Sequence, residues 1–121
     1  MFGFMEKREV RIPAVDCEIT PEDLKTQIAQ PNSIRLLDVR EPWEFQLAQI
    51  AGSCSIPIGE IPSRAHQELD PEEHIVVICH HGVRSLNVTH WLRQQGFERV
   101  QSLRGGIDRW SRVVDSAVPT Y

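Results

Sequence analysis

The pattern of apolar residues divides the chain into short segments of two alternating types. Two runs of apolar residues, 34–39 and 75–78, have the length and β-branched content of strands that are covered on both faces. Shorter strands are predicted at 50–57 and 100–103, and partial alternation predicts a first strand at 9–14. These segments supply the strands of one sheet.

Helix signals lie between the predicted strands. Thr20 suits an N-cap and Pro21 the first helical position, so a helix is expected to start there and to end before Pro31. Further helices are predicted from helical spacing and proline positions at 42–47, 58–68, 86–95 and 107–114. Strands that alternate with helices in this way predict an α/β fold, with a mainly parallel central sheet and helices on both faces.

One stretch joins a buried strand to a helix through a loop that begins with a cysteine. Cys79 directly follows the apolar run 75–78. A buried cysteine that simply packs is the ordinary alternative. Here Gly82 permits a backbone bend, and the N–H groups of residues 80 to 85 are close enough in sequence to curl around the sulfur. Such a ring of donors at a helix N-terminus stabilises a negative charge, on a persulfide sulfur or on an oxyanion.

The other residues of this loop add hydrogen-bond donors and charge. The planar guanidinium of Arg84 is suited to a small oxyanion, and Ser85 is expected to cap the following helix. His80 and His81 are expected to line the pocket mouth, to add partial positive charge and to offer proton transfer. Together with Val83 these residues form the predicted substrate-binding loop around Cys79.

Two residues near the end of an earlier strand are candidates for a supporting role. Ligands of open α/β sheets bind beyond the carboxyl ends of the strands. Asp38 ends a strong apolar strand, either as a turn or cap residue or as a carboxylate that hydrogen-bonds the active loop or orients Arg84. Arg40 is the second supporting candidate, and it is expected to form a partly solvated charge pair with Glu41.

Composition narrows the range of partners. A chain of 121 residues with a formal net charge of −4 fits one domain and has no basic field, so we expect no nucleic-acid partner. No run approaches the about 20 apolar residues of a membrane-spanning helix, so no membrane partner is expected.

The cysteines and histidines are arranged unfavourably for a disulfide framework or a metal. Three cysteines, Cys17, Cys54 and Cys79, are widely spaced without a C-x-x-C pair, which indicates a reducing, cytoplasmic setting. Adjacent residues on a tight loop rarely direct two imidazoles and a thiolate to one ion. No metal is therefore predicted at His80 and His81.

Five segments, taken in order, resemble the motifs of the rhodanese family of sulfurtransferases in its single-domain form. They are Ile19–Leu24, Leu37–Glu41 with Glu44-Phe45, Ile50–Ser53 with Ile56-Pro57, Cys79–Ser85 as C-x-x-G-x-R-S, and Leu103–Gly106 with Trp110. The third segment departs from the family, since Gln49, Ala51 and Ser53 stand where His, Pro and Ala are frequent.

The resemblance implies one rhodanese-like domain over residues 1–121, with a core at about 9–115 and tails at 1–8 and 116–121. It also implies a reaction. The Cys79 thiolate attacks the outer sulfur of a small anionic donor such as thiosulfate and becomes a persulfide. A thiol, a partner protein or, in vitro, cyanide then accepts the sulfur, with no metal or organic cofactor.

Two other functions remain open for this loop. Phosphatases and arsenate reductases on the same fold place five residues between cysteine and arginine, whereas four residues separate Cys79 from Arg84 here. The tighter ring favours a single sulfur atom over a phosphate. A non-catalytic sulfur carrier or interaction module is the other alternative.

Overall fold

The computed structural model describes residues 16–31 and 34–121, and the predicted strand at 9–14 lies outside these residues. Five parallel strands form one sheet in the order β1-β5-β4-β2-β3. They are β1 Glu18–Ile19, β2 Ile34–Asp38, β3 Cys54–Ser55, β4 His74–Ile78 and β5 Val100–Leu103. The α/β fold with a parallel central sheet is therefore confirmed.

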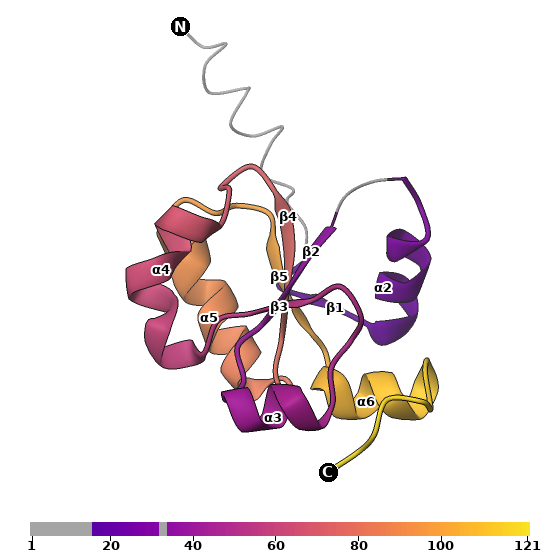
Figure 1. Ribbon diagram of the computed structural model, residues 1–121. Helices are drawn as coiled ribbons and strands as arrows, with labels where there is room; N and C mark the ends of the chain where they lie inside the picture. Colours follow the sequence, from indigo (N-terminus) through magenta and orange to yellow (C-terminus); the bar gives the residue numbers. More distant parts are fainter. Residues whose placement is uncertain (1–15, 32–33) are drawn as a thin grey trace, which may run out of the picture.

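Helices connect the strands and cover both faces of the sheet (Figure 1). They are α2 Pro21–Ile28, α3 Pro42–Leu47, the 3-10 turn η1 Ile58–Glu60, α4 Ile61–Glu68, α5 Val83–Gln94 and α6 Gly106–Val113. Thr20 caps α2 as predicted, with its hydroxyl accepting a hydrogen bond from the Asp23 N–H at 3.1 Å. None of the helices in the described part of the chain is long and apolar enough to cross a membrane.

The two faces of the sheet carry separate apolar clusters. On one face, Val77 of β4 packs with Ala65 of α4 and Leu92 of α5. On the other face, Val76 packs with Leu24 of α2 and Ile107 of α6. Alternate residues of β4 therefore enter opposite clusters, which explains why its sequence is continuously apolar.

Two elements differ from the sequence predictions. The apolar stretch 50–57 contains a strand only at Cys54–Ser55, because the chain turns at Ile50, whose carbonyl accepts from the N–H and the hydroxyl of Ser53. Helix α5 begins at Val83, three residues before the first residue of its apolar pattern, because Gly82 adopts a left-handed conformation and serves as the N-cap. Its first turn therefore belongs to the cysteine loop.

Segments from distant parts of the sequence meet beyond the carboxyl ends of the strands. In Figure 1, α3 follows β2 at this end of the sheet, close to the start of α5 and the C-terminal segment. The predicted tail at 116–121 packs against the domain, since Val118 is buried in the core and the Tyr121 hydroxyl bonds to Arg40. This end of the sheet holds Cys79.

Candidate active site

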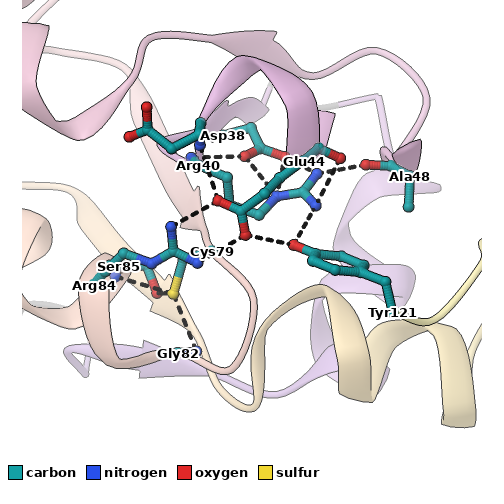
Figure 2. A network of polar contacts seen from close by, with 10 residues as sticks. Asp38, Arg40, Glu44, Ala48, Cys79, Gly82, Arg84, Ser85 and Tyr121 are labelled. Carbon is teal, nitrogen blue, oxygen red and sulfur yellow. Dashed lines mark hydrogen bonds and ion pairs between the residues drawn. The ribbon is translucent and has the colours of Figure 1, made fainter. Parts of the chain in front are cut away.

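Backbone and side-chain groups of the following loop surround the sulfur of Cys79 (Figure 2). The cysteine is only 1% exposed. The N–H groups of Gly82 and Ser85 donate to its Sγ at 3.1 Å and 3.2 Å, and the Ser85 Oγ lies 3.2 Å away. These donors stabilise a negative charge on Sγ or on an atom bound to it.

Ser85 has a role that the sequence did not predict. It lies inside the first turn of α5 and does not cap the helix, because the cap is Gly82. Its hydroxyl is 2.7 Å from the hydroxyl of Ser102 on β5, and both serines are fully buried. When Cys79 is ionised, the Ser85 hydroxyl donates to the sulfur and accepts from Ser102, so the pair extends the cradle by one donor.

The start of α6 holds the opposite side of the loop. The N–H of Ile107 donates to the Cys79 carbonyl at 2.9 Å, and the N–H of Asp108 donates to the His80 carbonyl at 3.1 Å. At Gly106, which has a φ of +64°, a Cβ would lie 2.6 Å from the Cys79 carbonyl oxygen. A side chain there would displace the Cys79 loop, so this close approach requires glycine.

The predicted supporting residues form a buried pair of their own. The Nη2 and Nε of Arg40 donate to Asp38 at 2.7 Å and 2.9 Å, and both side chains are fully buried. Arg40 also donates to the carbonyls of Glu44 and Ala48. The expectation that Arg40 forms a partly solvated pair with Glu41 is therefore wrong, because Asp38 binds the guanidinium in the interior instead.

Glu44, and not Asp38, is the carboxylate that contacts Arg84. Arg84 donates to its two oxygens at 2.8 Å and 3.1 Å, and the Glu41 N–H donates at 3.0 Å. The hydrogen bonds from Arg84 lower the pKa of Glu44 to about 2, although burial acts in the opposite direction. The only sequence signal for Glu44 was its place in a family motif.

Tyr121 joins the two ion pairs. Its hydroxyl accepts from Arg40 Nη1 at 2.8 Å and donates to Glu44 Oε2 at 2.8 Å, as Figure 2 shows. Its ring is parallel to that of His80, with centroids 3.9 Å apart and an angle of 4°. No periodicity in the sequence indicated this contact, because it joins residues of three separate segments.

The two histidines of the loop differ in burial. Burial, and then the neighbouring His81, lower the pKa of His80, which disfavours the partial positive charge predicted for this ring. His81 is exposed, with its Nε2 4.0 Å from Asp108.

A group of potential metal ligands lies beside the loop. His80, His81 and Asp108 each place one ligand atom within 4.8 Å of the others. They are one ligand short of a closed zinc site, and Asp108 is bound to Arg112 at 3.0 Å. The fold thus places a carboxylate beside the two histidines that are adjacent in sequence.

The structure gathers the predicted loop residues at two depths. Cys79, Gly82 and Ser85 are buried together, whereas His81, Val83 and Arg84 lie at the rim. Asp38 and Arg40 are placed behind Glu44 and reach the loop only through it and Tyr121. The donors of Gly82 and Ser85 thus converge on the Cys79 Sγ, and the guanidinium of Arg84 lies at the rim.

Comparisons with known proteins agree with this site. The model of the rhodanese-like domain matches residues 20–113. A sulfurtransferase of Allochromatium vinosum is 36% identical over 95 residues, which cover 78% of this chain and 88% of that protein. The chain therefore belongs to the rhodanese-like domain family.

One other relative and one solved structure show the range of this family. A chloroplastic rhodanese-like/PpiC domain-containing protein 12 of Arabidopsis thaliana is 35% identical over 92% of this chain, but the match spans only 38% of that protein. A rhodanese-related protein of Thermoplasma volcanium is 34% identical, with a TM-score of 0.72 and coverage of 80% of this chain and 92% of that chain. The domain thus occurs both alone and within longer proteins.

Proposed function

We propose that the protein transfers a sulfane sulfur through a persulfide on Cys79, with thiosulfate as a donor in vitro. The observation that carries this proposal is the cradle of donors from Gly82 and Ser85 around Sγ. These donors converge on one sulfur atom and suit a negative charge there, and the hydroxyl of Ser102 lies 2.7 Å from that of Ser85. Membership of a family with a named sulfurtransferase supports the same reaction.

The reaction proceeds in two steps, each an attack of sulfur on sulfur. The Cys79 thiolate attacks the outer sulfur of thiosulfate, and the bond to the central sulfur breaks so that its electron pair leaves with sulfite. The outer sulfur remains on Cys79 as a persulfide, and its negative charge lies among the loop donors. A thiolate acceptor, or cyanide in the assay, then takes this sulfur and releases the Cys79 thiolate.

Arg84 is proposed to bind the sulfonate end of the donor. Its bonds to Glu44 use one N–H each from Nη1 and Nη2, and its side chain is 35% exposed. A guanidinium has five N–H donors, so three remain for an anion at the mouth.

The pairing of Arg84 with Glu44 disfavours the phosphatase alternative. A phosphate in the cradle needs a guanidinium that wraps its oxygens, and Glu44 holds Arg84 through both terminal nitrogens. Sulfur transfer leaves only a single terminal sulfur on Cys79, whereas a phosphoryl group would bring three oxygens among the loop donors.

The test is thiocyanate formation from thiosulfate and cyanide by the whole chain. Cys79→Ser should abolish turnover, while Cys54→Ser, which changes a half-buried cysteine on β3, is the matched control and should retain it. Hydrolysis of an aryl phosphate is measured in parallel. Turnover of thiosulfate that persists in Cys79→Ser, or aryl phosphate hydrolysis that depends on Cys79, would overturn the proposal.

A further inference from the structure

Exposed apolar side chains gather around the mouth of the active site. In the described part of the chain, the exposed large hydrophobic residues are Ile28, Trp43, Leu47, Val83 and Val113. Trp43 and Leu47 lie on α3, which carries Glu44, and Val83 immediately precedes Arg84. We call Trp43, Leu47 and Val83 the apolar collar; Trp43 is 63% and Val83 71% exposed.

Ring contacts connect the collar to the catalytic loop. Trp43 makes an edge contact with Tyr121 at 6.1 Å between centroids. Tyr121 stacks on His80, the residue that follows Cys79. The ion pair of Glu44 and Arg84 bridges α3 and the start of α5, so collar residues are present on both sides of it. Two successive ring contacts therefore link Trp43 to the residue that follows Cys79.

The ion pair at this entrance carries no net charge. The carboxylate of Glu44 is paired with the guanidinium of Arg84 at 2.8 Å. A mouth with balanced charge and exposed apolar side chains complements an uncharged, apolar ligand surface better than a highly charged one.

We propose that the apolar collar recognises the acceptor, which is a cysteine flanked by apolar side chains on a polypeptide segment. This inference rests on the proposed Cys79 persulfide. The acceptor thiolate attacks the outer sulfur of that persulfide, the S–S bond to Cys79 breaks, and Cys79 leaves as a thiolate while the acceptor becomes a persulfide. Contacts of the flanking side chains with Trp43, Leu47 and Val83 hold the attacking sulfur in line with this bond.

The experiment compares two acceptor peptides on the loaded enzyme. The whole chain is loaded with thiosulfate, freed of excess donor and checked by mass for the added sulfur. It is then mixed rapidly with acetyl-Leu-Cys-Leu-amide or with acetyl-Ser-Cys-Ser-amide, and the loss of the persulfide is followed. We expect the second-order rate constant to be about tenfold higher for the leucine peptide, the size of effect that small apolar contacts produce.

Variants show whether the collar causes this preference. Trp43→Ser and Leu47→Ser should each reduce the ratio of the two rate constants toward one, whereas Ile28→Ser, an exposed apolar residue on α2, is the matched control and should retain it. Equal rates for the two peptides in the wild type, or an unchanged ratio in both collar variants, would overturn the inference while the proposed function stands. A chain that thiosulfate cannot load would overturn both.

Discussion

Glu44→Gln is expected to destabilise the folded protein and to remove part of its sensitivity to acid. The Arg84 hydrogen bonds lower the pKa of Glu44 from 4.5 to about 2 in the folded state. A difference of this size corresponds to about 3 kcal/mol in favour of the folded, ionised form at neutral pH. The Arg84 side chain is 35% exposed, so solvent screens the pair and we expect a loss of about 1–2 kcal/mol.

The pH dependence follows from the direction of this pKa shift. Because the pKa is lower in the folded chain than in the unfolded chain, the stabilisation is complete above pH 4.5 and is lost as the pH falls from 4.5 toward 2. Wild-type stability should therefore decline across this range. Glutamine does not titrate, so the variant should show a smaller decline.

Urea unfolding followed by tryptophan fluorescence, at pH 7 and at intervals down to pH 3, measures both effects. Glu68→Gln is the control, because Glu68 pairs with Arg64 on the exposed surface of α4 and should contribute little. Two results would show that the Glu44–Arg84 pair does not stabilise the protein in this way. One is a Glu44→Gln variant that is destabilised no more than Glu68→Gln. The other is a Glu44→Gln variant whose stability falls with acid as steeply as that of the wild type.

Three further substitutions test other parts of the site. Arg84→Ala should raise the KM for thiosulfate about tenfold or more, because the donor loses the guanidinium at the rim, and unchanged steady-state kinetics would remove Arg84 from the donor site. Tyr121→Phe should cost about 1 kcal/mol in urea unfolding, since the hydroxyl between Arg40 and Glu44 is lost; a stability equal to the wild type would show that this link is energetically silent. Gly106→Ala should cost about 2–4 kcal/mol and slow persulfide formation, because a Cβ meets the loop carbonyls; Gly59→Ala, where nothing lies within 4 Å, is the control, and equal stability of the two variants would contradict the close approach.

Local sequence patterns were sufficient for most of the fold. The continuous apolar run of β4 and the Thr20-Pro21 helix start depend on neighbouring residues, so they can be recognised without the tertiary structure. The stretch 50–57 was misleading, because Ile50 and Ile56 are buried although most of the stretch does not pair as a strand. Ile50 packs in the core from a turn, and only Cys54 and Ser55 pair with β2.

The site, like the fold, has a part that local sequence predicts and a part that it does not. The cysteine, Gly82 and Ser85 are close in sequence, and their cradle follows from the geometry of one short loop. Ser102 and Tyr121 reach the loop from β5 and from the end of the chain. A single sequence contains no signal for such pairings, which arise only when parallel strands place their carboxyl ends side by side.

The partners of the charged groups were the least predictable feature. Both Asp38 and Glu44 are carboxylates near Arg40 and Arg84 in the folded protein, and the choice of partner depends on burial and reach. Arg40 is fully buried and lies only two residues after Asp38, so its guanidinium reaches the Asp38 carboxylate directly. Arg84 lies at the rim and pairs with Glu44. Helix α3 places Glu44 opposite the start of α5, where Arg84 lies.

If the Cys79 sulfur carries the transferred atom, intact mass spectrometry will detect that atom on the protein. The whole chain is incubated with thiosulfate, desalted and weighed before and after treatment with cyanide. The account predicts that the wild type gains the mass of one sulfur atom, that cyanide removes it, and that Cys79→Ser gains nothing. A wild type without this gain, or the same gain in Cys79→Ser, would contradict the account.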